Sequence, residues 1–290
     1  MNKILTISER NNVLLTMADL IREEKEAIIK QNKKDLDGYN GDDLAMEDRL
    51  KVDDAKIDGM IASLEELASQ ADPLGKERFH FKHDNGMDVY NKTAPFGTIM
   101  IIYESRPDVT IEAAVLAFKA NNKIYLKGGK EAKNSNIILE KCWHEALEEN
   151  GLAKDWIELM HTNRTETQEF LQNPPVQLDL IVPRGGERLI QFVKDHAKCA
   201  VLVSGRGNNF LYVAEDADWE KAVKVIFNAK TDKISGCNAL DKVFIDKNIP
   251  AYESKLKEYD KAFHQKIIFN TLSFRATLVL YLVSITSDKS

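Results

Sequence analysis

The chain has 290 residues, of which 43% are hydrophobic and 30% charged, a balance typical of folded globular proteins. This length is enough for two domains, or for one large α/β domain, each with its own core. The formal net charge of -6 argues against nucleic-acid binding driven by overall charge, because such proteins usually carry a basic face. Lys and Arg residues are scattered along the chain, so a local anion pocket stays open.

The cysteines and histidines show no metal-binding pattern. Cys142, Cys199 and Cys237 form no CxxC pair, and the six dispersed histidines form no HExxH motif. We therefore expect no metal site, and the sparse, odd cysteine count suits a reducing compartment. Residues 1–15 contain neither a continuous apolar stretch nor a cleavage site, so we expect no signal peptide and a cytoplasmic location.

The first 75 residues have the pattern of amphipathic helices. Apolar residues recur at helical spacing after Ser8, the expected N-cap of the first helix, and again over residues 53–70. Residues 76–96 then alternate apolar and polar side chains around the turn sequence Asp84-Asn85-Gly86. This pattern predicts a β-hairpin that forms an arm.

From residue 97 onward, apolar strands alternate with helices. The expected strands span residues 97–105, 122–128, 156–160, 178–183 and 199–205. The expected helices span residues 109–120, 132–151, 165–171 and 187–197. This alternation predicts a parallel sheet covered on both faces, which is a doubly wound, Rossmann-like domain of the α/β class. Such sheets bind ligands outside the carboxyl ends of their strands.

The C-terminal region of the chain predicts further strands. Residues 208–233 give one strand and one helix, residues 242–247 give a strand, and Cys237 lies between them in a polar Ser-Gly-Cys-Asn turn. The tail, residues 267–290, is apolar and β-branched, which is typical either of buried strands or of a weak membrane segment. Arg275 and several hydroxyl residues argue against a membrane span.

Several loops that follow expected strands are rich in glycine and cations. Residues 127–130 read Lys-Gly-Gly-Lys, residues 183–186 read Pro-Arg-Gly-Gly, and residues 204–208 read Ser-Gly-Arg-Gly-Asn. Each alone is ordinary turn chemistry, but strand-end loops of one sheet converge on one edge, where together they indicate a phosphate site. The YESRPD sequence at 103–108 adds a carboxylate and a guanidinium there. No GxGxxG fingerprint is present, so this is not the usual dinucleotide motif.

The residues alone leave two interpretations of Cys237. It is either a small hydrophobic residue at an element boundary or a thiolate nucleophile. A thiol becomes nucleophilic where cations, a helix N-terminus or hydrogen bonds lower its pKa. Cys142 lies within an amphipathic helix and Cys199 begins a strand, so we expect both in the core.

Four separated segments carry a family resemblance: PFGTIMIIYESRPDVT, LKGGKEAKNSN, DLIVPRGGERLI and NAKTDKISGCNALDKVFI. In order and wording they resemble the γ-glutamyl phosphate reductases (glutamate-5-semialdehyde dehydrogenases) of the aldehyde dehydrogenase superfamily, from about residue 5 to about residue 260. The resemblance implies a Rossmann-like NADP(H) domain, an oligomerisation hairpin and a catalytic domain that carries the cysteine. The NADP(H) domain would comprise residues 97–233 together with the helical residues 1–75. The oligomerisation hairpin would be residues 76–96, and the start of the catalytic domain residues 234–265. An atypical tail follows at 266–290.

The resemblance also implies a reaction, in which NADPH reduces L-glutamyl 5-phosphate to L-glutamate 5-semialdehyde and phosphate for proline biosynthesis. The intermediate would be a thioester on Cys237. Residues that match the family's cofactor loops are Lys127, Gly128, Gly129, Lys130, Pro183, Arg184, Gly185 and Gly186. Those that match its substrate loop include Glu104 and Arg106. A Lys near the adenosine end would favour the 2′-phosphate of NADPH over NADH, and Asn238 is our own candidate for the oxyanion site.

The chain departs from the family pattern in several places. Gly207-Asn208-Asn209-Phe210 stands where the family often reads Gly-x-Cys-His, so a histidine is missing. Residues 204–208 lack the general-base Glu of many aldehyde dehydrogenases, which fits a reductase whose thioester should avoid hydrolysis. After about Lys261 the family pattern ends. We therefore expect an incomplete catalytic domain, and a hairpin without the strand that it normally pairs with.

Three functions follow as hypotheses. The first is the active reductase, with homo-oligomeric assembly and glutamate 5-kinase as a candidate partner. The second is a truncated, non-catalytic chain that at most binds NADP(H). The third is an unrelated thiol-dependent acyl transferase that uses the same cysteine. We also expect aggregation, because the hairpin edge and the apolar tail are unpaired.

Overall fold

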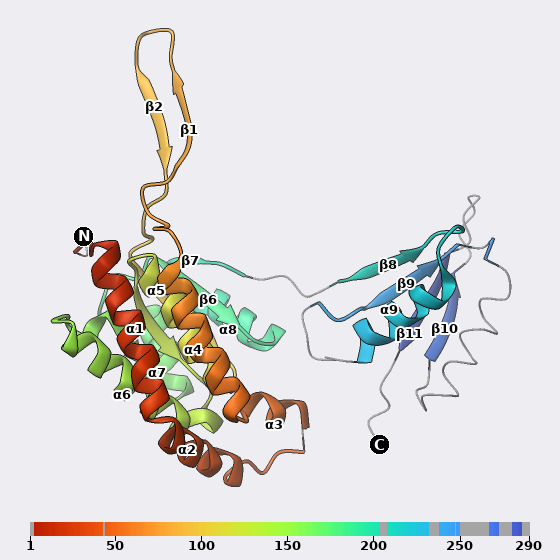
Figure 1. Cartoon of the computed structure of the whole chain (residues 1–290), viewed down its shortest axis with the longest axis horizontal. Coiled ribbons are helices and arrows are strands. Elements are labelled where there is room, and N and C mark those ends of the chain that lie inside the picture. The colour runs from red at the N-terminus through yellow and green to blue at the C-terminus, as the bar shows by residue number, and fades with distance from the viewer. Residues whose placement is uncertain are drawn as a thin grey trace. The chain divides into compact units, whose positions relative to one another are not determined.

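The structure is a computed structural model that describes residues 3–42, 44–203, 208–231, 238–246, 248–249, 267–272 and 280–285 (Figure 1). Cys237 and most of the 204–208 loop lie outside the described residues. The chain divides into two compact units, Met1–Ser204 and Gly205–Ser290.

The first unit begins with the helices α1 (Ile7–Glu23), α2 (Lys25–Asp37), α3 (Leu44–Leu50) and α4 (Asp54–Ser69). The N-cap of α1 is Thr6 and not Ser8, so that expectation is wrong. Thr6 and Glu9 form a capping box, in which the Glu9 N–H donates to Thr6 Oγ1 and the Thr6 N–H donates to Glu9 Oε2. A glutamate three residues after Thr6 completes this reciprocal pair, and Ser8 lies inside the helix.

The parallel sheet of the first unit has five strands: β3 (Thr98–Tyr103), β4 (Lys123–Lys127), β5 (Ile157–Leu159), β6 (Leu180–Arg184) and β7 (Ala200–Val201). Their order across the sheet is β5-β4-β3-β6-β7. The order reverses between β3 and β6, as in the dinucleotide-binding arrangement of doubly wound folds. Strand β7 has two residues, although the sequence predicts 199–205.

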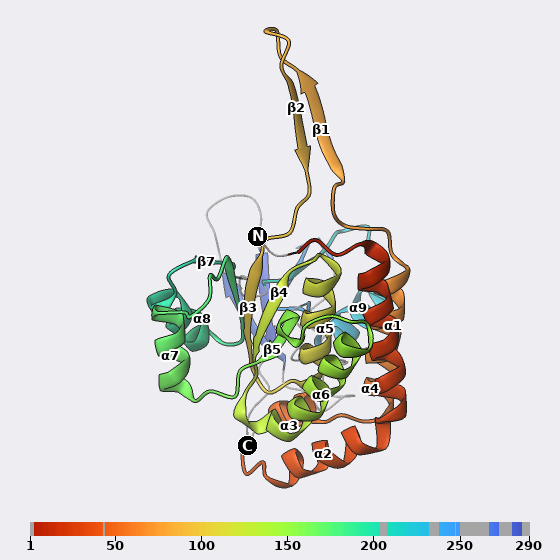
Figure 2. The same cartoon turned by 90° about the vertical axis from the view of Figure 1, so that its left-hand side faces the viewer.

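Helices cover both faces of this sheet (Figure 2). On one face lie α5 (Pro107–Lys119) and α6 (Lys133–Glu149), and on the other lie α7 (Arg164–Gln172) and α8 (Glu187–His196). Alternate residues of β3 divide between the two cores: Ile99 and Ile101 pack in the α5 and α6 layer, and Met100 and Ile102 pack with Leu171 and Val193. The predicted doubly wound fold is therefore confirmed.

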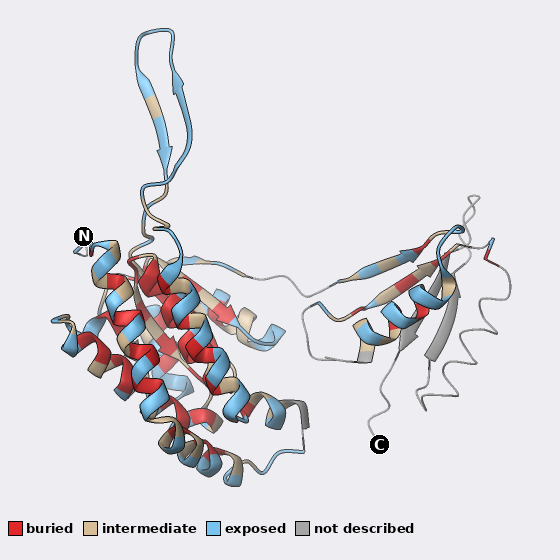
Figure 3. Cartoon of the chain, in the orientation of Figure 1, coloured by how far each residue is buried: buried red, intermediate tan, exposed pale blue. Residues whose placement is uncertain are grey.

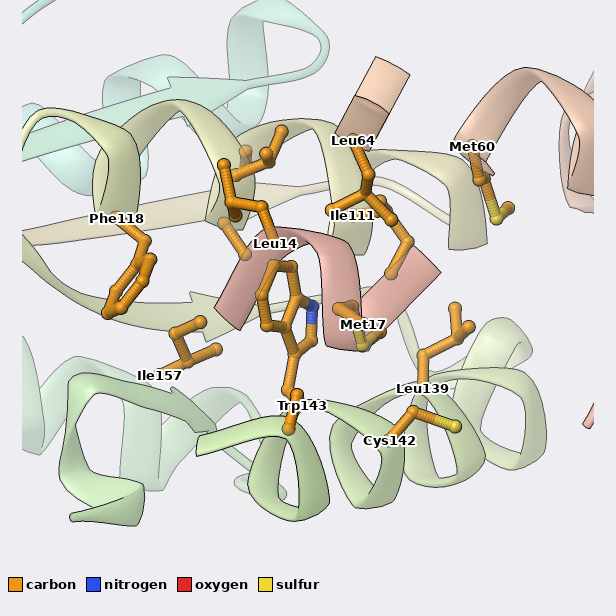
Figure 4. Packing of buried hydrophobic residues seen from close by; sticks show 14 of the residues in the cluster. Leu14, Met17, Met60, Leu64, Ile111, Phe118, Leu139, Cys142, Trp143 and Ile157 are labelled. Carbon is orange, nitrogen blue, oxygen red and sulfur yellow. The ribbon is translucent and has the colours of Figure 1, made fainter. Parts of the chain in front are cut away.

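The larger core lies between the sheet and the N-terminal helices. The indole of Trp143 on α6 extends toward Leu14 and Met17 of α1 (Figure 4). All three side chains are fully buried, as are Leu64 of α4 and Phe118 of α5. Because α1 and α4 pack over α5 and α6, they form a second helical layer on this face of the sheet.

The predicted hairpin projects from the first unit as β1 (Glu77–Lys82) and β2 (Asp88–Lys92) (Figure 3). The two strands pair antiparallel, with Phe81 opposite Val89, and form a two-stranded sheet of their own. Phe79 and Phe81 stack on each other at a centroid distance of 6.2 Å, and both are exposed. The turn closes through a hydrogen bond from the Gly86 N–H to the His83 carbonyl.

The second unit contains β8 (Phe210–Val213), α9 (Trp219–Thr231), β9 (Lys242–Ile245), β10 (Ile267–Leu272) and β11 (Leu280–Ile285). Their sheet has the order β10-β11-β9-β8. The sequence assigns residues 208–233 to the cofactor domain, but β8 pairs in parallel with β9 and so belongs to this second sheet. The tail contributes strands, and none of the described helices has the length and apolar character that crossing a membrane requires.

Candidate functional site

The predicted loops of the first unit meet at the carboxyl edge of the parallel sheet. Ile102 of β3 lies between Lys127 of β4 and Pro183 of β6 in the strand register, so these strands end at the same level. The loop after β3 then bonds to both neighbours. The Glu104 N–H donates to the Arg184 carbonyl at 3.3 Å, and Ser105 Oγ donates to Glu131 Oε2 at 2.5 Å.

The 183–186 loop is held by the side chain of Glu104. Glu104 Oε1 accepts a hydrogen bond from the Gly186 N–H at 2.8 Å, and Gly186 is the N-cap of α8. A Cβ atom on Gly185 would lie 2.8 Å from that same oxygen, so the loop needs glycine for this close approach. Pro183 is buried, whereas Arg184 is exposed at the edge.

The 127–132 loop begins with a partly buried cation and continues into a short 3₁₀ turn, Lys130–Ala132. Lys127 Nζ donates to the Gly128 carbonyl at 2.9 Å, and burial lowers the pKa of Lys127. A Cβ atom on Gly129 would collide with Ser105 Oγ and would lie 2.9 Å from Glu131 Oε2. These neighbouring side chains are sufficient to explain why residue 129 is a glycine. This agrees with the interpretation of the loop as an ordinary turn. Lys130 is exposed.

Two first-turn amides of α6 are already bonded to a carboxylate of the protein. Asp35 of α2 is buried, and its Oδ1 accepts from the Asn134 N–H at 2.9 Å while its Oδ2 accepts from the Ser135 N–H at 2.7 Å. A phosphate at this loop would therefore meet the residues before Asn134 rather than the start of the helix. Sequence reasoning missed Asp35, which lies on a polar helix about a hundred residues earlier.

Arg106, the candidate for a substrate anion, has a carboxylate partner of its own. Its Nη2 lies 2.8 Å from Asp108 Oδ2, and this hydrogen bond raises the pKa of Arg106. Lys56 of α4 carries its charge near the same pair, and burial lowers the pKa of Lys56. The Arg106 side chain is 38% exposed, so it can still meet a ligand.

A buried series of hydrogen-bonded hydroxyl and amide groups lies next to the carboxyl edge of the sheet. Tyr103 OH lies 2.7 Å from Thr110 Oγ1, which donates to Asn136 Oδ1 at 2.7 Å. Burial raises the pKa of Tyr103, so its hydroxyl stays protonated. This series connects the end of β3 to α5 and α6 and fixes the position at which β3 ends.

The second unit contains the candidate oxyanion residue. Asn238 is exposed, in the turn that leads to β9. The residues after it bond to Asn209, whose Nδ2 donates to the Ala239 carbonyl at 3.1 Å and whose carbonyl accepts from the Asp241 N–H at 3.0 Å. Asn209 belongs to the segment that departs from the family pattern, and its anchoring of this turn was not predicted.

The two described cysteines are unsuited to nucleophilic chemistry. Cys142 is buried as expected, and burial raises its pKa to about 12. Cys199 is partly buried, and burial raises its pKa as well. Both thiols are therefore protonated near neutral pH, and neither is suited to act as a nucleophile there.

The carboxyl edge has features that suit the phosphates of a dinucleotide. It lies where the strand order reverses, and exposed cations surround it at Lys130, Arg184 and Arg188. The first turn of α8 directs N–H groups toward the same edge, where a helix attracts phosphate. Among the described residues, His, Cys, Asp and Glu form no cluster of three or more that could hold a metal.

Comparison with known proteins gives a consistent result. The aldehyde dehydrogenase family pattern matches residues 3–270. A γ-glutamyl phosphate reductase of Idiomarina loihiensis is 38% identical over 270 residues, which cover 90% of this chain and 65% of that protein. The crystal structure of the Thermotoga maritima γ-glutamyl phosphate reductase matches with a TM-score of 0.78 at 35% identity, over 88% of this chain and 63% of that one.

The corresponding Saccharomyces cerevisiae structure matches with a TM-score of 0.64 at 28% identity, over 91% of this chain and 67% of that one. The chain thus spans about two thirds of the length of these relatives, from 63% to 67%.

Proposed function

The chain belongs to the aldehyde dehydrogenase family, and we propose that it carries the activity of a γ-glutamyl phosphate reductase. In this proposal NADPH reduces L-glutamyl 5-phosphate to L-glutamate 5-semialdehyde. The observation that carries the proposal is the 38% identity to a reductase of that name over 270 residues. The family match extends from residue 3 to residue 270 and so includes Cys237.

The carboxyl edge of the first unit would hold the nicotinamide cofactor, which supplies a hydride. Lys127–Lys130 would face the adenosine end, where the exposed Lys130 can pair with a 2′-phosphate. Pro183–Gly186 and the first turn of α8 would hold the phosphates that join the two nucleosides. The cations and amides described at this edge support that assignment.

The chemistry proposed for Cys237 is covalent. Its thiolate sulfur attacks the carbonyl carbon of the acyl phosphate, the carbon–oxygen bond to phosphate breaks, and phosphate leaves with the electron pair. Hydride reduction of the resulting thioester is followed by cleavage of the carbon–sulfur bond, which returns the electron pair to sulfur and releases the aldehyde. Asn238 and nearby backbone N–H groups would stabilise the oxyanions on this route.

Arg106 would bind an anionic group of the substrate. Its guanidinium is partly exposed and already oriented by Asp108. A planar guanidinium binds carboxylate or phosphate through parallel hydrogen bonds, so it can contact a ligand through the N–H groups that Asp108 leaves accessible.

The test is the reverse reaction in purified protein. Glutamate semialdehyde, NADP⁺ and phosphate should yield NADPH, detected by its absorbance, and omission of phosphate should abolish the signal. Cys237→Ser should remove turnover and leave NADP⁺ affinity nearly unchanged. Unchanged turnover in this variant would eliminate the thioester mechanism.

A second candidate function is cofactor binding without turnover. It is favoured by the position of the proposed cofactor residues, which all lie in the first unit, Met1–Ser204, whereas Cys237 follows that unit in the chain. Binding of NADP⁺ in the absence of any semialdehyde oxidation would support it.

We further propose a cytoplasmic homo-oligomer, with glutamate 5-kinase as a candidate partner. Co-sedimentation of the two purified proteins tests that partnership.

A further inference from the structure

We propose that Glu104 is a positioning residue, which orders the Arg184–Gly186 loop for the cofactor rather than binding the substrate itself. The inference rests on the proposed function only for the identity of the cofactor. It reassigns a residue that the family resemblance places in the substrate loop.

The backbone N–H of Glu104 and both of its carboxylate oxygens contact other groups of the protein. Its N–H donates to the Arg184 carbonyl at 3.3 Å, and its Oε1 accepts from the Gly186 N–H at 2.8 Å. Its Oε2 lies 3.5 Å from Arg49 Nη1 on α3. One residue thus joins the end of β3, the loop after β6 and a helix of the N-terminal layer.

The two carboxylate contacts differ in strength. A hydrogen bond from a backbone N–H to a carboxylate is charge-assisted, and it is stronger than a hydrogen bond between two neutral groups. The Arg49 pair is longer, and 31% and 36% of the Arg49 and Glu104 side chains are exposed, so water and salt weaken it. The bond to Gly186 therefore carries most of the effect, and Arg49 mainly limits the rotamers of Glu104.

The position of Gly186 matters because it is the N-cap of α8. Its conformation decides where the first-turn N–H groups of that helix point, and these are the proposed donors to the cofactor phosphates. Glu104 also packs on Gly185. A Cβ atom on Gly185 would lie 2.8 Å from Glu104 Oε1 and 2.9 Å from Leu189 Cδ2. The side chain thus holds the loop from one side.

Charge and position predict opposite effects on cofactor affinity. By charge alone, removal of a carboxylate from a phosphate-binding edge should tighten the binding of an anionic cofactor. Under the positioning role, loss of the Gly186 hydrogen bond should weaken it. Glu104→Gln removes the charge but keeps an oxygen that can accept from Gly186, whereas Glu104→Ala removes both.

The experiment measures two quantities in the full chain without substrate: the NADP⁺ dissociation constant by calorimetry, and the exchange rate of the Gly186 amide by NMR. We expect Glu104→Ala to raise the dissociation constant about tenfold, as loss of one charge-assisted hydrogen bond implies, and to speed Gly186 exchange. Glu104→Gln should bind NADP⁺ as tightly as wild type or more tightly. Arg49→Ala should change the constant about threefold or less.

Glu149→Ala, an exposed glutamate at the end of α6, is the matched control and should change neither quantity. Unchanged affinity and exchange in Glu104→Ala would overturn the proposal, and so would equal weakening in Glu104→Gln and Glu104→Ala. If wild type binds no NADP⁺, the proposed function fails, and the Gly186 exchange rates alone decide the role of Glu104.

Discussion

Burial makes the thiols of the two described cysteines less reactive than an ordinary thiol. Cys142 and Cys199 have raised pKa values because of burial, and that of Cys142 reaches about 12. Only the thiolate is nucleophilic, so both thiols should be inert where a catalytic thiol reacts. The sequence pattern placed both cysteines in the core, but the direction and size of their pKa shifts depend on packing that the pattern does not show.

Thiol labelling tests this difference. At pH 8 iodoacetamide should modify Cys237 first, Cys199 slowly and Cys142 only after unfolding, as followed by peptide mass spectrometry. Rapid labelling of Cys142 in folded protein would contradict the burial described.

The raised pKa of Cys142 also predicts how stability depends on pH. Because this pKa lies above that of an ordinary thiol, 9.0, the folded protein keeps a proton that the unfolded chain loses. The free energy of unfolding should therefore fall as the pH rises from about 9 toward 12.

Cofactor preference should depend on Lys130. Lys130→Glu places a carboxylate where a cation is proposed to meet the 2′-phosphate, so the ratio of NADP⁺ to NAD⁺ affinity should fall about tenfold or more. Lys141→Ala, an exposed lysine farther along α6, is the control. Calorimetric titration with both cofactors gives the ratio. An unchanged ratio in Lys130→Glu would remove Lys130 from the cofactor site.

At the scale of elements, local patterns predict the strands and helices of the first unit well. Apolar runs mark β3, β4 and β6, and the glycine loops after them lie at one edge as expected. The exceptions depend on partners distant in sequence. The free amides expected at α6 are bound by Asp35, which is separated from Asn134 by 99 positions, and no local pattern reveals such a pair.

Asp35 should be among the residues most important for stability. Its carboxylate accepts from two N–H groups and from the side chains of Asn134 and Ser135, all at 2.9 Å or less. Asp35→Ala should lower the free energy of unfolding by roughly 2–4 kcal/mol, because buried donors lose their acceptor. Asp37→Ala, on the exposed end of the same helix, should have little effect. Urea unfolding measures both, and equal stability of the two variants would refute this role.

For the whole molecule, the hairpin is notable because it gathers several exposed aromatic side chains on two short strands. Phe79, Phe81 and Tyr90 are each about half exposed, at 52%, 47% and 51%, and the hairpin forms a sheet of two strands only. Unpaired strand edges with exposed aromatic side chains promote association between chains. Phe79→Ser with Phe81→Ser should therefore shift sedimentation toward smaller species.

Leu15→Ser changes a single exposed apolar residue on α1 and serves as the control for that shift. Identical sedimentation of the hairpin variant and wild type would show that association occurs elsewhere.

The sequence predicts the hairpin from the alternation of its side chains and from its turn. It assigns β8 and α9 to the wrong domain, because the strand that pairs with β8 follows the Cys237 turn.

We propose above that the carboxyl edge of the five-stranded sheet binds the nicotinamide cofactor. Amide hydrogen exchange with and without NADP⁺ reports on this edge residue by residue. We predict slower exchange at residues 127–133 and 184–189 on addition of NADP⁺, with no change in the hairpin at 77–92. Protection confined to other segments, or none at saturating NADP⁺, would show that the cofactor does not bind at this edge.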